Sequence, residues 1–307
     1  MPKAYVFTRY GGPETEALVD VDRPVPGPDE LLIAVRAAGV NPVDYKIRNG
    51  YRGAGQSPAE LPAVLGSEVS GVVVETGADV TGFAVGDEVF GASFSGGYAE
   101  YAVLPQGQSA HKPAALSFAA AATLSVAAAT AYDGIRQLDL TPGATLLVTG
   151  AGGGVGVAAV QIAHGAGLKV LGLASDGKKE LLTSLGVIHV PSGPGWPERV
   201  RAAAPDGLDG IFDLVGGEVF EDTAKLTADG TKLITAAARP QEAERLGGAR
   251  VARARTGAVL EAIAALVIDG TLDPQVTGTF PLERAGEALR VVEEGHSRGK
   301  VVIEVSP

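Results

Sequence analysis

Hydrophobic positions follow two different rhythms along the chain. Up to about Pro113, short apolar runs are separated by glycine and proline turns, and these runs lie at residues 31–35, 69–75, 87–92 and 98–104. Short runs between such turns predict a β-rich, barrel-like domain. Beyond Pro113, strands of about six residues alternate with helices of about twelve, which predicts a parallel sheet covered by helices. We therefore expect an α/β protein with a domain boundary near Ser117.

In the second region, apolar-rich runs at residues 144–149, 169–174, 210–214 and 231–236 predict successive strands, each with a helix pattern before or after it, as in a doubly wound sheet. After Pro274 the chain offers a strand at 277–280, a helix at 282–295 and a last strand at 300–305, and we expect this tail to return to the first domain. The predicted domains are therefore residues 1–116 joined by 274–307, and residues 117–273.

The most apolar stretch, residues 114–131, is rich in alanine and interrupted by serine and threonine. These hydroxyl groups favour a helix buried inside the protein over a membrane span. The chain starts directly in an alternating strand pattern, without the long apolar core of a secretion signal. The sequence contains no cysteine, which agrees with a reducing compartment, so we expect a cytoplasmic protein.

Composition and charge exclude several classes of protein. The 43 glycines among 307 residues follow no three-residue period, which excludes collagen. Without cysteine there is no disulfide framework and no thiolate metal site. Acidic residues outnumber basic ones by 36 to 25, and a net charge of −11 repels phosphate backbones, which argues against nucleic-acid binding.

A glycine-rich loop follows the strand at 144–149 and leads into a helix at 157–164. The residues at the offsets of a G-x-G-x-x-G loop are Ala151, Gly153 and Gly156, with Gly154 and Val155 between the last two. Such glycines let the backbone approach a pyrophosphate, and the helix N-terminus attracts the anion. We expect these residues to bind a dinucleotide cofactor. The alternative is a plain tight turn.

The end of the second strand indicates which nicotinamide cofactor is used. A carboxylate there would hydrogen-bond an unmodified ribose and repel a 2′-phosphate. The chain instead has Ala174 and Ser175, followed by Lys178 and Lys179, so the pattern favours NADPH. Asp176 is a carboxylate close to this position, and it argues against NADPH. The lysine pair could also simply mark the exposed start of a helix.

In addition to the loop at 151–156, five stretches of the chain match motifs of a known family, at residues 39–44, 65–73, 85–90, 97–101 and 293–302. With these motifs the chain resembles the zinc-free medium-chain dehydrogenases/reductases of the quinone oxidoreductase branch over nearly its whole length. The resemblance implies a GroES-like β-barrel catalytic domain that includes the tail, a Rossmann domain, and an active site in the cleft between them.

The same resemblance bears on metal binding. Zinc alcohol dehydrogenases of the family have a ligating cysteine where this chain has Asn41 and a ligating histidine where it has Ser67. Neither replacement is a good zinc ligand. The histidines are scattered and match no ligand spacing, so we expect no metal.

The resemblance also implies roles for individual side chains near the nicotinamide. It puts Asn41, Tyr45 and Tyr51 at the catalytic end of the cleft, where an amide can orient a carbonyl and a phenol can donate a hydrogen bond. Turn shaping and ordinary packing are the alternatives. Thr130 and Lys300 are further candidates for cofactor contact, while Asp44 is expected to cap the following helix rather than to act in catalysis.

The expected function is NADPH-dependent hydride transfer to a quinone without metal or flavin. An enone or enal reductase is the nearest alternative, and a nonenzymatic cofactor-binding protein is a more distant one. By resemblance we expect a homodimer, with residues 251–255 as a late strand that pairs across an edge. The residues that contact adenine are not identified, because residues 189–193 lack the aromatic side chain common in relatives.

Overall fold

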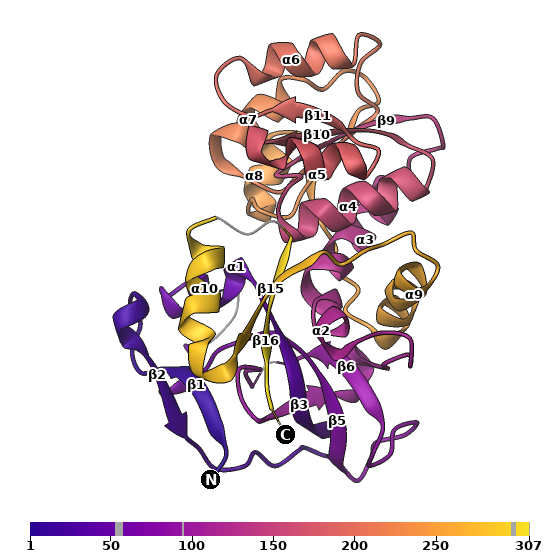
Figure 1. Ribbon diagram of the computed structural model, residues 1–307. Coiled ribbons are helices and arrows are strands. Elements are labelled where there is room, and N and C mark those ends of the chain that lie inside the picture. The colour runs from indigo at the N-terminus through magenta and orange to yellow at the C-terminus, as the bar shows by residue number, and fades with distance from the viewer. Residues whose placement is uncertain (53–57, 94, 296–298, 307) are drawn as a thin grey trace. The chain divides into compact units, whose positions relative to one another are not determined.

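The computed structural model describes residues 1–52, 58–93, 95–295 and 299–306. The chain divides into two compact units (Figure 1). The first consists of Met1–Val126, Arg255–Ile268 and Pro274–Pro307, and the second of Ala127–Ala254 and Asp269–Asp273. Tyr51, predicted as a catalytic residue, lies just before the first gap in this description.

The first unit is built from two sheets. A three-stranded sheet has the order β2-β1-β4, and a seven-stranded sheet has the order β15-β16-β3-β5-β6-β8, with β7 also paired to β3. All strand pairs are antiparallel except the pair β15–β16. The strands are β1 (Lys3–Phe7), β2 (Glu16–Asp20), β3 (Glu30–Val40), β4 (Ala63–Val64), β5 (Glu68–Thr76), β6 (Glu88–Ala92), β7 (Tyr101–Pro105), β8 (Ser109–His111), β15 (Val276–Pro281) and β16 (Lys300–Glu304).

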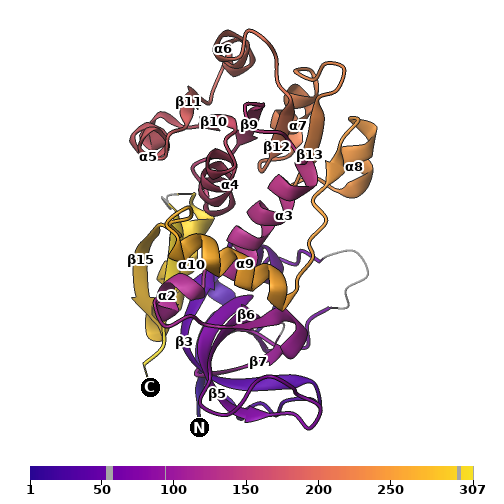
Figure 2. The same cartoon turned by 90° about the vertical axis from the view of Figure 1, so that its right-hand side faces the viewer.

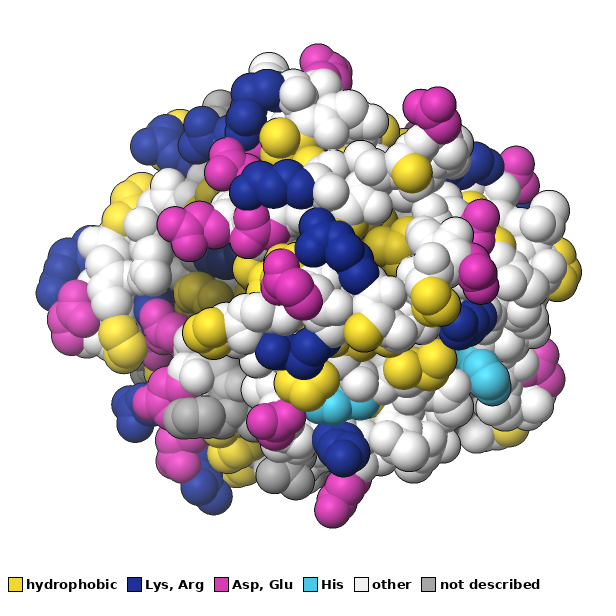
Figure 3. Space-filling model, turned by 90° about the horizontal axis from the view of Figure 1, so that it is seen from above, with side chains coloured by type: hydrophobic (Ala, Val, Ile, Leu, Met, Phe, Trp, Pro, Cys, Tyr) yellow, Lys and Arg dark blue, Asp and Glu magenta, His cyan; other side chains and the backbone are white. Residues whose placement is uncertain are grey.

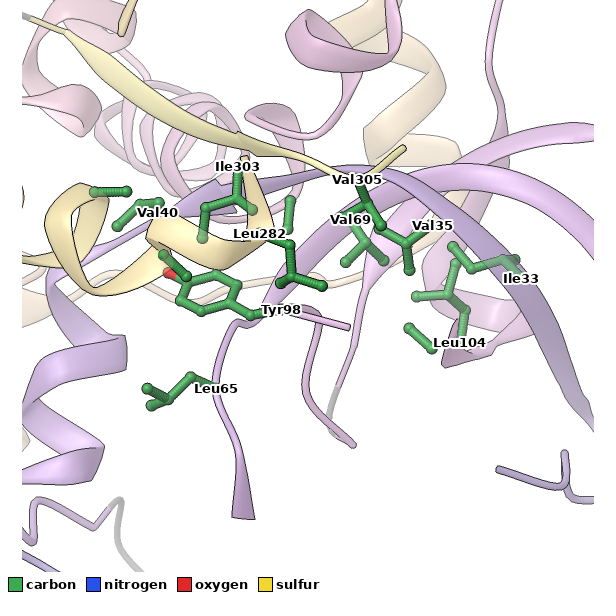
Figure 4. Packing of buried hydrophobic residues seen from close by; sticks show 14 of the residues in the cluster. Ile33, Val35, Val40, Leu65, Val69, Tyr98, Leu104, Leu282, Ile303 and Val305 are labelled. Atoms are coloured by element: carbon green, nitrogen blue, oxygen red, sulfur yellow. The ribbon is translucent and has the colours of Figure 1, made fainter. Parts of the chain in front are cut away.

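The tail of the chain completes the core of this unit. Strand β16 pairs with β3, with Val301 opposite Val40, as the sequence analysis expects of the tail. Helix α10 (Ala285–Glu293) precedes this strand. Tail residues Leu282 and Ile303 lie in one hydrophobic cluster with Val69 and Tyr98 (Figure 4). Segments far apart in the sequence therefore share one core.

Arg48, the last residue of α1 (Pro42–Arg48), is a buried cation in the first unit. Its guanidinium donates hydrogen bonds to Glu16 at the start of β2 and, at 2.6 Å, to Glu293 at the end of α10. Because a buried charge is costly unless it is paired, these contacts fix the position of α1 against the tail helix.

The second unit contains a six-stranded parallel sheet with the order β11-β10-β9-β12-β13-β14, which confirms the predicted doubly wound arrangement. The sequence order of the strands runs one way along the sheet from β9 to β11 and the other way from β12 to β14, so it reverses between β9 and β12. The strands are β9 (Thr145–Thr149), β10 (Lys169–Ala174), β11 (Ile188–Pro191), β12 (Gly210–Asp213), β13 (Lys232–Thr235) and β14 (Ala249–Arg250). The helices are α3 (Ala129–Leu138), α4 (Gly154–Gly165), α5 (Lys179–Ser184), α6 (Trp196–Ala203), α7 (Gly217–Ala224) and α8 (Pro240–Arg245).

Both faces of this sheet are covered by helices (Figure 2). Since side chains alternate along a strand, neighbouring residues of β12 serve opposite faces. Ile211 packs in a cluster with Trp196 of α6 and Phe220 of α7, whereas Phe212 lies against Gly134 of α3. Strand β12 is therefore apolar on both sides, which explains the continuous apolar run at this place in the sequence.

Three expectations from the sequence differ from the structure, and the first is the domain boundary, which lies after Val126 instead of near Ser117. Residues 251–255 do not form a strand, because the amides of Ala252 and Ala254 donate to side chains of α3, Gln137 (2.8 Å) and Asp133 (2.9 Å). The edge strand of this sheet is instead the short β14. The homodimer stays a prediction, but the strand at 251–255 that was expected to form its interface is absent from the structure. In addition, α9 (Gly257–Ile268) belongs to the first unit, where Gly257 packs against Ser109.

One helical segment, Phe118–Leu138, passes a length and composition test for a membrane span, and 67% of its most apolar window is buried inside the protein. It comprises α2 (Phe118–Ala121), a π-helical turn (Leu124–Ala128) and α3. This burial agrees with the core helix expected from the sequence.

On the face shown in Figure 3, acidic and basic side chains are interspersed.

Gly134 offers a test of the packing between α3 and the sheet. A Cβ at this position would lie 2.4 Å from Cζ of Phe212, so we expect Gly134→Ala to lower the free energy of unfolding by about 1–3 kcal/mol. Urea denaturation measures the change. Gly107→Ala is the control, since nothing lies within 4 Å of its added Cβ. Equal stability of the two variants would contradict this packing argument.

Candidate functional site

The glycine-rich loop joins β9 to the N-terminus of α4. Gly150 has a φ of +64°, a left-handed conformation that favours glycine, and Gly153 is the residue before the helix. The first bond within the helix runs from the Val157 amide to the Gly153 carbonyl at 2.8 Å. The amides of residues 154–156 therefore precede the helical ladder and are available for an anion, as a pyrophosphate requires.

Gly153 and Gly156, two of the three glycines predicted to bind the cofactor, serve different purposes. A Cβ at Gly156 would lie 2.3 Å from the Gly150 carbonyl oxygen, so glycine is needed there for the helix to pack on the loop. A Cβ at Gly153 would meet only that same oxygen, at 3.4 Å, and the residue is exposed. The exposed side of Gly153 is therefore where a ligand can approach the backbone.

Ala151 replaces the first glycine of the usual loop without disturbing it. Its amide donates to the Leu173 carbonyl at 3.1 Å, and its side chain is fully buried. A Cβ at Gly172 of β10 would lie 3.0 Å from the Ala151 methyl group. The missing side chain at Gly172 thus makes room for the methyl group at Ala151. Sequence reasoning missed Gly172, although a glycine inside an apolar strand is a sign of close approach.

The end of β10 presents a polar edge beside this loop. Ser175 is exposed, and Lys178 is half-buried because its stem lies over Gly152. A Cβ at Gly152 would be only 2.6 Å from Cγ of Lys178. Lys179, in contrast, is exposed at the start of α5. The structure therefore brings Lys178, rather than its neighbour, to the glycine loop.

A second polar cluster lies in the first unit around Lys300. The Lys300 ammonium donates to Asn41 Oδ1 (2.6 Å), Glu68 Oε1 (2.7 Å) and the Val40 carbonyl (3.2 Å). Asn41 Nδ2 in turn donates to Glu68 Oε1 at 2.8 Å. All three side chains are buried. Contact of Lys300 with the cofactor stays a prediction, but each hydrogen of its ammonium already has an acceptor within this unit.

Asn41, predicted to orient the substrate, is held rigidly by this cluster. Its oxygen accepts from the Lys300 ammonium, and one hydrogen of Nδ2 is donated to Glu68. Among the contacts that the structure describes, the second hydrogen of Nδ2 has no acceptor, so it can be donated to a ligand. Glu68 Oε2 also accepts from the Val126 amide at 2.7 Å. Sequence reasoning did not single out Glu68, whose partner Lys300 is 232 residues away.

Asp44 caps α1, as expected, and is fully buried. Its Oδ2 accepts from the Asn41 amide and the Tyr98 hydroxyl, each at 2.8 Å, and its Oδ1 accepts from the Ser67 hydroxyl at 2.9 Å. Burial raises the pKa of Asp44 to about 6, although these hydrogen bonds oppose the rise. Burial also raises the pKa of the Tyr98 phenol.

The remaining predicted site residues, Tyr45, Tyr51 and Thr130, differ in their burial. Tyr45 is half-buried against the core of the first unit, and burial together with the charge of Glu293 raises its pKa. Tyr51 is 47% exposed. Thr130 is buried in α3 of the second unit. The catalytic roles of the two tyrosines and the cofactor contact of Thr130 stay predictions.

Within the described part of the chain, no group of three His, Asp or Glu residues is placed to hold a metal ion. The side chains at the two positions where zinc relatives have ligands are engaged elsewhere, Asn41 with Lys300 and Glu68, and Ser67 with Asp44. The glycine loop, the free helix N-terminus and Lys178 do fit a nicotinamide dinucleotide.

Comparison with known proteins places these features in a family. The alcohol dehydrogenase GroES-like domain matches residues 27–114, and the zinc-binding dehydrogenase model matches residues 185–303. The 2-methylene-furan-3-one reductase of Solanum lycopersicum is 35% identical, with 99% of this chain and 79% of the relative covered. The NADPH-dependent alkenal/one oxidoreductase of Arabidopsis thaliana is 34% identical, with 99% and 80% covered. The quinone oxidoreductase structure from Coxiella burnetii has a TM-score of 0.90 at 30% identity, with 99% of each chain covered.

The fold and the glycine loop, taken with these relatives, define an oxidoreductase that uses a nicotinamide cofactor. The chain belongs to the medium-chain dehydrogenase/reductase family. This membership confirms the fold and the resemblance identified from the sequence, and it removes the nonenzymatic alternative.

The buried carboxyl of Asp44 predicts a specific pH dependence of stability. Its pKa is about 6 in the folded state against an ordinary value of 3.8, so the folded protein holds the proton more tightly than the unfolded chain does. This contribution is full below pH 4 and is lost as the pH rises to about 6. We expect the difference in unfolding free energy between the parent and Asp44→Asn to fall by roughly 3 kcal/mol between pH 4 and 7. Urea denaturation across this range measures it, and a pH-independent difference would contradict the assignment.

Proposed function

We propose that the protein is an NADPH-dependent reductase that transfers hydride to a conjugated carbonyl compound, in the first place a quinone. The observation that carries the choice of cofactor is the position of Lys178 over Gly152, at the end of a strand that lacks a carboxylate. A cation there attracts a 2′-phosphate, and Ser175 can donate to it. The quinone as acceptor is supported by the likeness to the Coxiella burnetii quinone oxidoreductase.

The chain's own residues bind and orient the reactants. NADPH supplies the hydride, so the protein needs to hold the acceptor carbon near it and to stabilise charge on the acceptor oxygen. The remaining amide hydrogen of Asn41 is the proposed donor to that oxygen, and the Lys300–Glu68 pair holds the amide in one orientation. Hydrogen bonds fixed before the reaction stabilise developing charge most effectively.

An enone or enal reductase is the second candidate. It is favoured by the two plant relatives at 34% and 35% identity, whose names denote an alkenal/one oxidoreductase and a methylene-furanone reductase. Hydride transfer to an enone puts charge on a carbonyl oxygen in the same way, so Asn41 serves either acceptor.

Cofactor preference tests the role of Lys178. We expect NADPH to bind at least about tenfold more tightly than NADH, a gap of roughly 1.4 kcal/mol. Lys178→Ala should reduce that preference and leave NADH binding nearly unchanged, whereas Lys179→Ala, at an exposed position, should keep it. Fluorescence titration of the parent and the two variants with both cofactors gives the six affinities. Equal binding of NADPH and NADH by the parent would refute the proposed cofactor.

Acceptor choice is tested by turnover of a small quinone and a small enone under the same conditions. We expect NADPH consumption with both compounds and a larger kcat/KM for the quinone. A larger kcat/KM for the enone would assign the second candidate function instead. Absence of NADPH consumption with either compound would overturn both.

Asn41→Ala tests orientation of the acceptor by hydrogen bonding. Loss of one preorganised donor is expected to lower kcat/KM by roughly tenfold to a hundredfold, with little change in NADPH affinity. Activity should also survive exhaustive treatment with EDTA. Thermal unfolding shows whether the variant stays folded, because Lys300 and Glu68 each lose a partner. Loss of activity with EDTA and its recovery with Zn²⁺ would show the mechanism to be wrong, as would an unimpaired variant.

A further inference from the structure

Asp213, the last residue of β12, has a fully buried carboxylate that joins the ends of three neighbouring strands. Its Oδ1 accepts from the hydroxyl of Thr149 at the end of β9, and its Oδ2 accepts from the hydroxyl of Thr235 at the end of β13, each at 2.7 Å. It also accepts from the amides of Val215 (3.2 Å) and Gly216 (3.1 and 3.2 Å). The loop after β12 is thereby fixed to the same carboxylate.

The direction of most of these hydrogen bonds makes the carboxyl group of Asp213 an acceptor. The Thr149 hydroxyl accepts from the Leu214 amide at 3.0 Å, and the Thr235 hydroxyl accepts from the amides of Ala237 (3.0 Å) and Ala238 (3.1 Å). Because these two amides occupy both acceptor positions of the Thr235 hydroxyl, that hydroxyl gives its own hydrogen to Asp213. Asp213 is then the acceptor for this hydroxyl and for the amides of Val215 and Gly216.

No counter-charge accompanies this carboxylate. Among the residues that the structure describes, buried Glu68 is paired with Lys300 and Glu16 with Arg48, but no ion pair involves Asp213. Hydrogen bonds alone hold its negative charge inside the protein. Such a charge acts on its surroundings more strongly than an exposed one, because the buried site is poorly screened.

Asp213 lies where the sheet changes direction. Dinucleotides bind across the carboxyl ends of the strands at this switch point, here between β9 and β12. A dinucleotide held by Ser175 and Lys178 at its adenosine half and by the glycine loop at its pyrophosphate would have its nicotinamide half toward the ends of β12 and β13, which Asp213 holds together.

The side chain of Val215 marks the same place on the surface. It is 50% exposed, and its Cγ2 would be 3.2 Å from a Cβ at Gly150 of the glycine loop. An exposed apolar side chain beside the phosphate-binding loop suits contact with a flat ring. The loop that carries it is the one whose amides donate to Asp213.

We propose that Asp213 is the positioning residue for the nicotinamide end of the cofactor, and that its buried charge favours the oxidised ring, which is positively charged, over the neutral reduced ring. The inference rests on the proposed function for the identity of the cofactor. By stabilising the oxidised product relative to NADPH, the carboxylate promotes departure of the hydride. Asp213 does this through space and through the loops it orders.

The test compares the dissociation constants of NADP⁺ and NADPH, measured by calorimetry without an acceptor. In Asp213→Asn, which keeps the size of the side chain and removes its charge, NADP⁺ binding should weaken roughly tenfold more than NADPH binding. Thr149→Val is the matched control, since it removes one hydrogen bond and keeps the charge. It should weaken both forms by the same factor. Equal factors in Asp213→Asn, or no change, would overturn the electrostatic role.

A second pair of variants covers the case in which Asp213→Asn does not fold, as judged by circular dichroism. Val215→Lys and Val215→Met have similar lengths at an exposed position and differ in charge. The lysine should weaken NADP⁺ relative to NADPH, because the oxidised ring lies beside it, and the methionine should not. The same ratio in both variants would place the ring elsewhere and overturn the proposal.

Failure of the proposed function has a different signature. A parent protein that prefers NADH is measured with NAD⁺ and NADH instead, and the same change of ratio is expected. A wrong acceptor leaves all these binding constants unaffected. A parent that binds no nicotinamide cofactor overturns both proposals, whereas unaltered ratios with normal binding overturn only the role of Asp213.

Discussion

The buried pair of Lys300 and Glu68 is the contact on which the first unit depends. A lysine and a glutamate that are almost wholly inaccessible to water are tolerated only when each has a charged partner and its remaining hydrogen bonds are satisfied. Here the start of α1 supplies Asn41, β3 supplies a carbonyl, and the π-helical turn supplies an amide. Removal of either charge would leave the other buried and unpaired, at a cost of about 3–5 kcal/mol. Strand β16, α1 and the π-helical turn are thus held in register by one pair of charges.

The second unit also contains a buried acidic side chain, but no ion pair with a cation is described for it. Asp213 draws its support from threonine hydroxyls and backbone amides, which the ends of parallel strands and the loops after them provide. The two buried acids therefore differ in what they do to their surroundings. The charge of Glu68 is neutralised locally by Lys300, while that of Asp213 acts on the edge of the sheet where we propose that the cofactor binds.

Much of the fold was predictable from the sequence because it depends on local patterns. Strands such as β9 and β10 are short apolar runs bounded by turns, and their predicted limits differ from the observed ones by at most a residue or so. The strand expected at residues 251–255 was wrong because its amides bond to Gln137 and Asp133, more than a hundred residues earlier. No local pattern reports such a competitor. The glycine loop was equally recognisable, yet its tolerance of Ala151 depends on Gly172 in the next strand.

In the candidate site too, residues with a local sequence pattern could be predicted, whereas contacts between distant residues could not. Gly156 and Lys178 could be selected from spacing and charge alone, whereas the engagement of Lys300 with Glu68 and Asn41 emerges only when the chain has folded back on itself. Asp213 gave no signal in the sequence beyond its place at the end of a strand. Its importance arises from the threonines that the parallel register sets beside it.

The central place of β16 in its sheet has a consequence for the order of events during synthesis. This strand lies between β15 and β3, so the seven-stranded sheet stays split until residues 300–304 have left the ribosome. Most of the second unit is one continuous stretch, Ala127–Ala254, and its sheet is complete in sequence much earlier. Domains generally fold as units during translation. The second unit is therefore able to fold while the first unit still exposes the gap in its sheet, which makes the unpaired edges of β3 and β15 the segments most in need of protection in the nascent chain.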